Sequence, residues 1–326
     1  MTVAPAASGV HRFAARAMGS PLRLTLVGSD DRAAATIWSA VRDDVEATEQ
    51  ALSRFRESAE LVGLNRRLGV PVPVGDRLYR ALTAAERARR VTSGRFDARV
   101  LRDLERLGEH GATAGPRTAA HPAEDVPPGE PSVRRRPRSR LVRIEEPIDL
   151  GGIGKGLALR WAARLVERLA AEGTAEECGY LLEAGGDIAC RGPAPDGATW
   201  RIAIEAPDEG VAPAAVVAAV GGAVMTSSRL VRHWRSPAGD DVHHLIDPAT
   251  HEPAGDGLVS VTVAGPDPAW SEVWSKSLFV AGRGGIGPLA RSRGLAAWWI
   301  DADGRVAMTP AARERTLWVR DEAATA

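Results

Sequence analysis

Lysine is almost absent from this chain of 326 residues. Lys and Arg together number 42, yet lysine occurs only at Lys155 and Lys276, and every other fixed positive side chain is an arginine. The formal net charge is +0, which argues against general binding of nucleic acids or other polyanions. Two isolated lysines in such a chain therefore each require a specific explanation.

Cysteine and long apolar runs are also scarce. The two cysteines, Cys178 and Cys190, exclude a dense disulfide framework, and a cysteine metal site would need more ligands. They can pair, but we expect two small core residues. No run of about 18 apolar residues occurs, so no membrane span is predicted. The first twenty residues contain neither an apolar signal segment nor a lipid-attachment cysteine, which predicts a cytoplasmic protein.

The apolar residues that are present alternate in some segments and recur at helical spacing in others. Strands are predicted at 21–28, 141–150, 201–206 and 258–265, with a hairpin at 297–308 around Asp303-Gly304. Helices are predicted at 33–52, from a possible N-cap at Asp76, from the end of the turn at 151–156 to about Glu172, and at 267–282. These elements follow no strict strand–helix–strand rhythm, so the sequence predicts an α+β fold.

Residues 110–140 differ in character. They contain six prolines and the basic run Arg134–Arg136. This composition is typical of a loop or disordered insertion without a core of its own.

The segment IDLGGIGKG at 148–156 combines a strand, a glycine-rich turn and a helix N-terminus. Glycines let backbone N–H groups approach phosphate oxygens, and the helix dipole favours negative charge there. Lys155 would add a full positive charge. The spacing matches neither a Walker A loop nor G-x-G-x-x-G. A tight structural turn therefore explains this pattern as well as a phosphate site does.

Two further segments have weaker signals. In EAGGDI, two glycines precede Asp187, which fits either an ordinary turn or a close backbone approach beside a carboxylate. In AVMTSSRLVRHW, Thr226, Ser227 and Ser228 follow an apolar stretch. Their hydroxyls can bond a phosphate or a metal-bound water, or they can cap a helix.

The segment HHLIDPATHEPA places His243, His244 and Asp247 within five residues, and Asp-Pro begins a turn. A histidine at such a corner can act as general acid or base, or contact a cofactor. Either histidine can equally be a satisfied core residue. The spacing is not that of a zinc site.

The late helix at 267–282 begins with Asp267 and Pro268, a favourable N-cap and N1 pair. Glu272 and Lys276 lie one turn apart on it. From spacing alone, the simplest interpretation is a solvent-facing ion pair worth about 0.2–0.5 kcal/mol.

Taken in order, eight segments resemble the ApbE family, the FAD:protein FMN transferases. They are AMGSPL (17–22), LSRFRESAEL and LN (52–65), SGRFDARV (93–100), IDLGGIGKG (148–156), EAGGDI (183–188), AVMTSS (223–228), HHLIDPATHEPA (243–254) and SVTVAG (260–265). Each is short, but eight in the family's order make the resemblance specific. It implies a single flavin transferase domain over residues 10–320, with a Pro/Arg-rich flexible loop at about 110–140.

The resemblance implies an α+β, two-lobed fold with FAD in the cleft between the lobes and Mg²⁺ at its pyrophosphate. The family cleaves that pyrophosphate, releases AMP and joins FMN to a Thr or Ser of a partner protein. The partner usually carries an Asp-x-x-(Thr/Ser)-Gly-Ala-Thr stretch. We therefore expect FAD as substrate, Mg²⁺, and an acceptor flavoprotein with such a stretch, but neither nucleic acid nor membrane insertion.

Carried over by position, the resemblance implies a set of site residues. Met18 would contact the flavin side, and Phe55 would meet a ring of FAD. Phe96 and Asp97 would hold the adenosine portion, and His244 would lie near the reacting phosphate or the incoming hydroxyl. The expected FAD-binding residues are Met18, Phe55, Phe96, Asp97, Gly151, Gly152, Lys155, Gly186, Asp187, Thr226, Ser227 and His244. The expected catalytic residues are His244, Lys155 and Asp247.

The implied metal set is a backbone carbonyl at Ala158, a carboxylate at Glu272 and a side chain at position 276. The family usually has Asp and Thr at the last two positions, whereas this chain has Glu272 and Lys276. An ammonium group has no lone pair for a metal. Two readings stay open. Either Mg²⁺ binds through Glu272, Ala158 and waters, or the ammonium of Lys276 replaces part of the metal's charge.

Other departures from the family pattern are Ser228 for Gly, Glu183 for Asn, Ala59 for Ser and Arg160 for Asp. Such changes favour an altered substrate or weakened catalysis. The alternatives to FMN transfer are accordingly an FAD pyrophosphatase and a catalytically weakened FAD-binding protein. All three depend on the turn at 151–156 and the helix bearing Glu272 converging on one FAD diphosphate.

Overall fold

The protein divides into two compact units. The structure is a computed structural model that describes residues 9–112, 133–136, 139–172, 178–207, 212–320 and 324–325. The first unit comprises residues 1–46, 155–228 and 255–326, and the second comprises residues 47–154 and 229–254. The expected α+β class is confirmed, because both helices and mainly antiparallel sheets are present.

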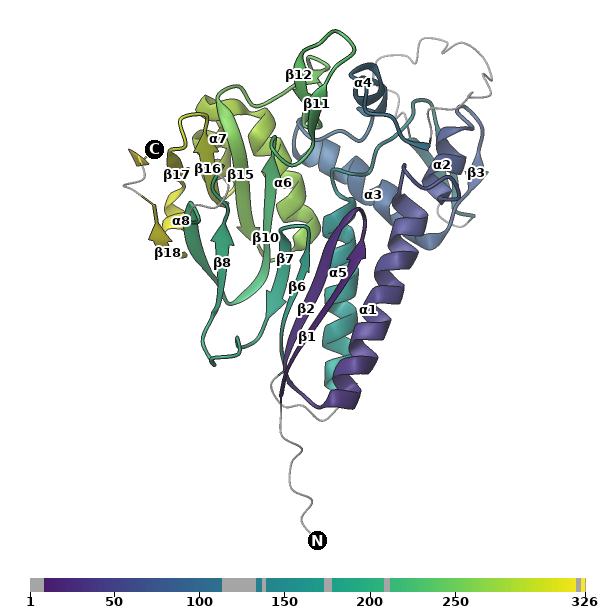
Figure 1. The fold of residues 1–326 in the computed structure, drawn as a ribbon. Helices are drawn as coiled ribbons and strands as arrows, with labels where there is room; N and C mark the ends of the chain where they lie inside the picture. Colours follow the sequence, from purple (N-terminus) through teal and green to yellow (C-terminus); the bar gives the residue numbers. More distant parts are fainter. Residues whose placement is uncertain are drawn as a thin grey trace. The chain divides into compact units, whose positions relative to one another are not determined.

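A nine-stranded sheet forms the centre of the first unit (Figure 1). Its order is β1 (Gly9–Ala17), β2 (Ser20–Ser29), β6 (Gly179–Ala184), β7 (Asp187–Arg191), β10 (Gly221–Ser228), β15 (Leu258–Gly265), β16 (Ala296–Asp301), β17 (Val306–Met308) and β19 (Ala324–Thr325). Neighbours are antiparallel except for β17 and β19. Such pairing distinguishes the sheet from a doubly wound parallel one.

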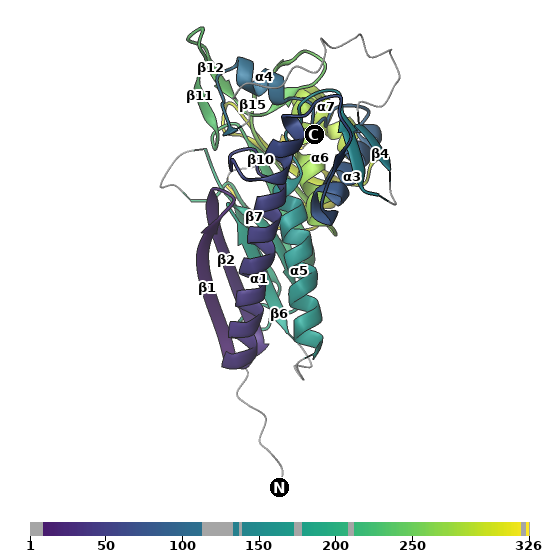
Figure 2. The ribbon, with the colours of Figure 1, turned by 90° about the vertical axis from the view of Figure 1, so that its right-hand side faces the viewer.

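Helices cover one face of this sheet. The helices with residues in the first unit are α1 (Asp31–Leu52), which continues into the second unit, α5 (Gly154–Glu172), α6 (Pro268–Val280), α7 (Gly282–Ser292) and α8 (Pro310–Arg313). Figure 2 shows α1 and α5 side by side along this face. Alternate leucines of β2, Leu24 and Leu26, pack with Ile37 and Val41 of α1 and with Leu159 of α5. The two periodicities in the sequence therefore meet in one core.

A three-stranded sheet covers the other face. Its order is β18 (Thr316–Val319), β9 (Ala215–Ala219) and β8 (Trp200–Ile204). Ile202 and Val217 pack there with Trp298, which is fully buried. In β10, Val224 joins this core while Met225 joins the core on the helix side. Because side chains alternate along a strand, Ser227 faces the helix side with Met225.

The turn between β6 and β7 is a two-residue hairpin. Gly185 and Gly186 have φ values of 60° and 87°, the left-handed pair that a type I′ turn requires. A Cβ on Gly185 would lie 2.7 Å from the Cβ of Ser20, so this turn lies beside the turn that joins β1 to β2. EAGGDI therefore forms a tight turn with Asp187 directly after it.

The second unit contains short helices and small sheets. Its elements are α2 (Glu60–Asn65), α3 (Asp76–Val91), α4 (Leu101–Arg106), the sheet β3 (Val72–Pro73), β5 (Leu141–Ile144) and β4 (Val133–Arg136), and the hairpins β11 (His233–Arg235) with β12 (Asp241–His243) and β13 (Ile246–Asp247) with β14 (Glu252–Pro253). Leu104 and Leu107 pack with Val242 and Ile246, which fixes the two hairpins against α4.

Several sequence expectations need correction in this unit. The strand predicted at 141–150 ends at Ile144, because the backbone of Ile148 pairs with the Asn65 side chain at 2.8 and 2.9 Å instead of with a strand. The basic run at Arg134–Arg136 lies in β4 rather than in a loop. Gly75, not Asp76, is the N-cap of α3. Residues 113–132 and 137–138 of the expected 110–140 loop lie outside the described residues.

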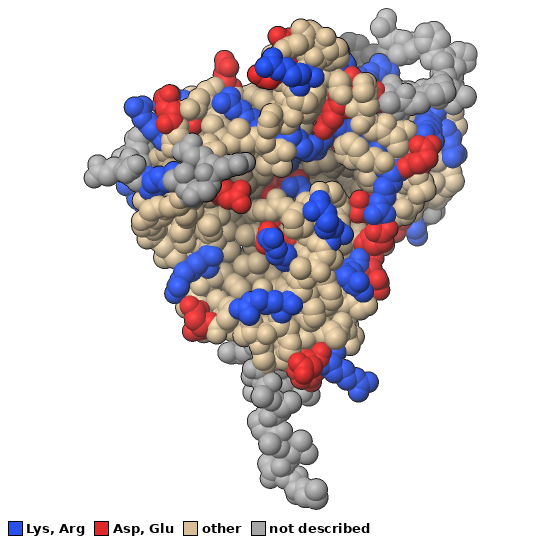
Figure 3. Space-filling model, in the orientation of Figure 1, with Lys and Arg blue, Asp and Glu red and all other residues tan. Residues whose placement is uncertain are grey.

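Helix length, surface charge and the cysteines bear on the expectations from composition. Within the described ranges, no helix combines the length and apolar character that spanning a bilayer demands. On the face drawn in Figure 3, acidic and basic side chains are interspersed. Both cysteines are free, and burial raises the pKa of the Cys190 thiol to about 11.

Candidate active site

The glycine-rich segment at 151–156 is a turn that leads into α5. Asp149 Oδ1 accepts the Gly151 N–H at 2.6 Å, and the Leu150 carbonyl accepts the Gly154 N–H at 2.7 Å. Two residues further into the helix, the Gly156 N–H donates to Glu272 Oε2 at 2.7 Å. Negative charge is favoured at a helix N-terminus. Here the protein's own carboxylates supply it.

Gly156 allows α5 and α6 to approach each other closely. A Cβ at this position would lie 2.6 Å from the Cα of Ala269 and 2.8 Å from the Pro268 carbonyl oxygen. Both are backbone atoms, which cannot move aside cheaply. The glycine is therefore required by packing, and it lets this part of α5 lie directly against the start of α6, the helix that bears Glu272.

Glu272 is the most enclosed acid of the site. Its side chain is 1% exposed, and both carboxylate oxygens have donors. Oε2 accepts the Gly156 N–H, and Oε1 accepts Lys276 Nζ at 3.1 Å. Lys276 is itself only 16% exposed, so the expected solvent-facing ion pair is wrong. Because α6 packs between β10, β15 and α7, even this polar pair lies inside the unit.

Lys155 forms the second lysine–carboxylate pair. Its ammonium contacts Asp187 Oδ2, and Asp187 is 2% exposed at the start of β7. The other oxygen, Oδ1, accepts the Thr226 N–H at 3.0 Å. Desolvating a carboxylate this far is tolerated only with charged and hydrogen-bonded partners. Asp187 has both, and they hold Lys155 over the end of β10.

Two serine hydroxyls connect β10 to α6. Ser227 Oγ lies 2.7 Å from Ser275 Oγ, which in turn donates to the Glu272 carbonyl at 2.9 Å. Since Ser275 uses its proton on that carbonyl, Ser227 is the donor to Ser275. On the opposite side of β10, Thr226 Oγ1 bonds Thr262 Oγ1 at 2.9 Å. The expected site residues Lys155, Asp187, Thr226, Ser227 and Glu272 thus form one connected network within the first unit.

Each buried carboxyl group in the described part of the chain has a cation beside it. The pairs are Asp149 with Arg54 (3.3 Å), Asp187 with Lys155, Glu272 with Lys276 (3.1 Å) and Asp301 with Arg283 (3.1 Å). The two lysines of the chain are accordingly both used on the buried acids of the candidate site, while arginines serve the other two.

The implied Mg²⁺ site can be tested against these contacts. Mg²⁺ needs oxygen ligands with available lone pairs. Lys276 Nζ lies 3.1 Å from Glu272 Oε1, so an ion bound at this carboxylate would sit beside a fixed positive charge, and Lys276 itself is a donor only. No group of three or more His, Cys, Asp or Glu side chains in the described ranges is placed to hold a metal. Ala158 lies in the second turn of α5, 1% exposed, and adds at most one carbonyl. These residues do not fit a Mg²⁺ ion bound by the protein.

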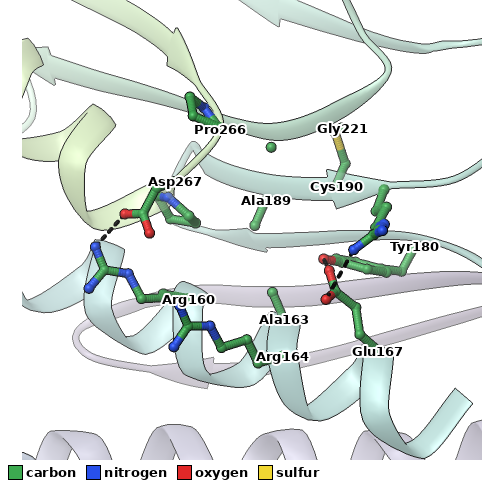
Figure 4. Close-up of a pocket in the computed structure, with 13 residues that line it drawn as sticks. Arg160, Ala163, Arg164, Glu167, Tyr180, Ala189, Cys190, Gly221, Pro266 and Asp267 are labelled. Atoms are coloured by element: carbon green, nitrogen blue, oxygen red, sulfur yellow. Dashed lines mark hydrogen bonds and ion pairs between the residues drawn. The ribbon is translucent and has the colours of Figure 1, made fainter. Parts of the chain in front are cut away.

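A separate hollow of about 390 Å³ lies beside α5 (Figure 4). It is lined by Arg160, Ala163, Arg164, Glu167, Tyr180, Ala189, Cys190, Arg191, Gly221, Gly222, Pro266, Asp267 and Pro268. None of the expected FAD-binding residues is among them. Arg160 pairs there with Asp267, whose Oδ1 also caps α6 through the Trp270 N–H at 3.0 Å. Arg160, one of the departures from the family pattern, therefore links α5 to the start of α6 through Asp267.

Met18 lies in the turn between β1 and β2, with a φ of 51°. Its side chain packs against the helix-side core. Because the Gly185–Gly186 turn contacts Ser20, the structure brings the Met18 turn and Gly186 together at one end of the sheet.

In the second unit, His244 is oriented by the backbone of Arg232. The Arg232 carbonyl accepts from the His244 backbone N–H at 3.3 Å and from its ring Nδ1 at 3.2 Å. A carbonyl oxygen accepts only, so Nδ1 carries the proton in the neutral ring. Nε2 is then the basic nitrogen. Asp247 Oδ1 accepts the Ala249 N–H at 2.9 Å, which confirms the expected Asp-Pro turn.

His243 has a different environment from its neighbour. Burial and, after it, the charge of Arg229 lower the pKa of His243, a hydrogen bond with the Ala254 backbone raises it, and the resulting pKa is about 4. His243 is therefore neutral near pH 7. Of the two adjacent histidines, this half-buried one fits the role of a hydrogen-bonded structural residue.

Phe55 presents an exposed aromatic ring, with 55% of its surface accessible. The guanidinium carbon of Arg54 lies 4.2 Å from the ring centre and that of Arg232 lies 5.7 Å away. Glu109 holds both arginines, with Arg54 Nη2 at 2.5 Å and Arg232 Nε at 2.9 Å. Through Arg232, the structure brings Phe55 and His244 into one cluster.

Phe96 and Asp97 are both engaged within the protein: Phe96 is buried, and Asp97 is bonded to two arginines. Phe96 is 4% exposed. Asp97 bonds Arg89 Nε at 3.0 Å and Arg99 Nε at 2.9 Å. Burial raises the pKa of Asp97, but the hydrogen bonds and charge of Arg99, helped by Arg89, outweigh it and leave the pKa below its ordinary value. Asp97 is thus a stable anion between two arginines.

Comparison with known proteins assigns this architecture. A model of the ApbE family matches residues 18–299. The chain belongs to the ApbE family. Among curated relatives, the FAD:protein FMN transferase of Salmonella typhimurium is 28% identical over 313 residues, covering 93% of this chain and 87% of the relative. The FAD:protein FMN transferase of Escherichia coli K12 is 27% identical over 298 residues, covering 89% and 83%.

Solved structures of the ApbE family share the fold. The crystal structure of the ApbE protein from Thermotoga maritima aligns with a TM-score of 0.79 and 25% identity, covering 94% of this chain and 99% of that one. The apo form of the flavinyl transferase ApbE from Pseudomonas stutzeri aligns with a TM-score of 0.77 and 26% identity, covering 94% and 97%.

Sequence reasoning missed several residues that support the ApbE site. Asp149 had a local signal, because an acid two residues before a glycine commonly bonds its backbone N–H. Ser275 also had one, since serine in a helix often bonds a carbonyl one turn back. Glu109 and Arg54 had none, because 55 residues separate them in the chain.

Proposed function

We propose that this chain is an FAD:protein FMN transferase that joins FMN from FAD to a Thr or Ser hydroxyl of a partner protein and releases AMP. The observation that carries the proposal is the match to the ApbE family over residues 18–299, with curated relatives of that name aligned over most of their length. Several members of the two clusters lie on segments that carry the resemblance, namely Lys155, Asp187, Thr226, Ser227, Phe55 and His244.

The proposed reaction exchanges one phosphoester for another. The acceptor hydroxyl oxygen attacks the phosphorus of the FMN half, the bond from that phosphorus to the bridging oxygen breaks, and AMP leaves with the bonding electrons. The hydroxyl loses its proton. Positive groups that meet the developing charge, and a base placed near the hydroxyl, are what such a transfer requires.

We assign the proton acceptance to His244. Its Nδ1 is fixed as donor by the Arg232 carbonyl, which makes Nε2 the nitrogen that can take a proton. Asp247 holds the turn that follows and is proposed to position this histidine. Phe55, backed by Arg54, is proposed to stack on a ring of FAD, with Met18 at the flavin and Phe96–Asp97 toward the adenosine.

Lys155 is the proposed phosphate contact in the first unit. Asp187 keeps its ammonium beside β10, where Thr226 and Ser227 lie. Gly151, Gly152 and Gly186 are proposed to allow close backbone approach to FAD. Two interpretations of the metal set were open: Mg²⁺ bound through Glu272, or an ammonium in its place. They do not fit the contacts of Glu272 equally well. The occupied oxygens of Glu272 favour the second, so no step is assigned to a metal.

The acceptor is proposed to be a flavoprotein with a DxxTGAT-like stretch. Incubating the full chain with FAD and a peptide of this type, followed by mass spectrometry, tests the proposal. A mass gain of one FMN unit on the peptide, matched by AMP, is expected, whereas a Thr→Val peptide should gain nothing. AMP without labelled peptide would replace the proposal with FAD hydrolysis, and FAD binding without AMP would replace it with a binding protein.

A further inference from the structure

The Glu272 carboxylate already has the coordination that a bound cation would provide. Oε1 contacts Lys276 Nζ at 3.1 Å and Oε2 accepts the Gly156 N–H at 2.7 Å. With 1% of its surface exposed, Glu272 has no access to water that would screen its charge. The single positive charge of Lys276 and the helix N-terminus together balance it.

Lys276 reaches Glu272 from one turn further along the same helix. The Lys276 side chain is 16% exposed, and Glu272 is its one partner within the described ranges. An ammonium has three N–H bonds, so two are left for another acceptor. A diphosphate oxygen is an acceptor of the right charge. The group is therefore placed to hold the protein carboxylate and an anionic substrate at once, which is what a bridging metal ion does elsewhere.

A divalent cation would be excluded from the same place. It would have to displace the ammonium from Oε1 and remain next to it, with two like charges in a poorly hydrated interior. It would also lack a set of protein ligands, since no group of three or more His, Cys, Asp or Glu side chains in the described part of the chain is placed to hold a metal.

We propose that the ammonium of Lys276 takes the place of a divalent cation at Glu272, so that the site binds no metal of its own and works without added Mg²⁺. The first half concerns the protein alone. The second half rests on the proposed FMN transfer.

Titration of the FAD-free protein with Mn²⁺, followed by electron paramagnetic resonance, tests the first half. The unaltered chain should leave all Mn²⁺ in its free signal. Lys276→Thr removes the ammonium, adds a hydroxyl oxygen and should create one bound Mn²⁺ per chain. Lys276→Arg keeps the charge and should bind none. Mn²⁺ bound by the unaltered chain and lost in Glu272→Gln would overturn the proposal.

The folding of each variant is checked in the same samples. Thermal unfolding with and without Mg²⁺ should show no shift for the unaltered chain and for Lys276→Arg, and an upward shift for Lys276→Thr, because an ion that binds only the folded state stabilises it. The double variant Glu272→Gln/Lys276→Thr should lose that shift. If Lys276→Thr folds and still binds no ion, the ammonium was not what excluded the metal, and the proposal fails.

Transfer to the acceptor peptide in EDTA and in Mg²⁺ tests the second half. The unaltered chain should keep its rate in EDTA, whereas loss of a catalytic metal slows a reaction by on the order of 10²-fold or more. Lys276→Thr should become dependent on Mg²⁺. A rate for the unaltered chain that collapses in EDTA would refute metal independence. If no peptide is labelled in either condition, FMN transfer itself fails, while the Mn²⁺ titration still decides the role of Lys276.

Discussion

The two groups of candidate residues are held in contrasting ways. In the first unit, Glu272 and Asp187 are almost fully buried, and each has a lysine and a backbone N–H as partners. In the second unit, Phe55 projects into solvent beside arginines. The charged side chains of the first group are already paired with one another in the protein without a ligand. The second offers a ring and a basic nitrogen that can adapt to one. Substitutions in the first group should therefore reduce stability, and those in the second should reduce activity.

The strongest test of the second group is His244→Gln. If Nε2 takes the acceptor proton, kcat should fall by about 10²–10⁴-fold with little change in the free energy of unfolding. The exposed His251→Gln, which removes a histidine paired with Asp103 at 3.0 Å, is the control and should keep its rate. A loss of less than tenfold at position 244 would exclude it as the base.

The strongest test of the first group is Glu272→Met. It leaves the ammonium of Lys276 and the Gly156 N–H without an acceptor, so the free energy of unfolding in urea should fall by about 3 kcal/mol. Adding Lys276→Met to this variant removes the unpaired charge and should restore part of the loss. If the double variant is the less stable of the two, the pair is not the source of the effect.

Gly156→Ala tests the close approach of α5 and α6. Its Cβ would meet backbone atoms of Pro268 and Ala269, so the free energy of unfolding should fall by about 1–3 kcal/mol. Gly284→Ala in α7 meets nothing within 4 Å and should be neutral or stabilising by up to about 1 kcal/mol. Equal effects at both positions would show that packing does not require Gly156.

Phe55→Ala should act on binding alone. Loss of a stacked aromatic ring costs about 0.5–1.5 kcal/mol, so KM for FAD should rise by up to about tenfold while kcat stays nearly constant. Leu317→Ala, which removes an equally exposed apolar side chain in the first unit, should leave KM unchanged. An unchanged KM in Phe55→Ala would remove this ring from the FAD site.

The smallest expected effect concerns His243. Its folded-state pKa of about 4 lies below the ordinary value of 6.5, so between these pH values the unfolded chain binds a proton that the folded chain does not. The free energy of unfolding should then decrease as pH falls from 6.5 toward 4, and this contribution should be complete above 6.5. His243→Gln should make the stability–pH profile shallower in that window. An unchanged profile would mean that His243 is hydrated in the folded protein.

Local patterns in the sequence were sufficient to predict the type and the approximate bounds of several helices and strands. The alternating leucines of β2, the apolar run of β15 and the Asp267–Pro268 start of α6 each depend on neighbours in the chain, and each was predicted within a few residues. β1 was missed, because its side chains are all half-buried or exposed and give no clear apolar alternation. The strand predicted to reach Asp149 stops early, because Asn65 replaces a neighbouring strand there.

The candidate site shows the same limit. The i,i+4 spacing of Glu272 and Lys276 was enough to predict their ion pair, but not its burial, which depends on β10, β15 and α7 packing around α6. The contact of Glu272 with Gly156 joins residues 116 positions apart and follows from the fold alone. Short motifs along the chain therefore indicate which segments form the site, whereas the donors that surround each Glu272 oxygen follow only from the fold.

The confinement of both lysines to this network makes the site chemically addressable. A reagent selective for ε-amino groups has two side-chain targets in the whole protein, and each is paired with a buried acid. Peptide mapping after such labelling would therefore report the accessibility of Lys155 and Lys276 alone, because the arginines do not react with the reagent.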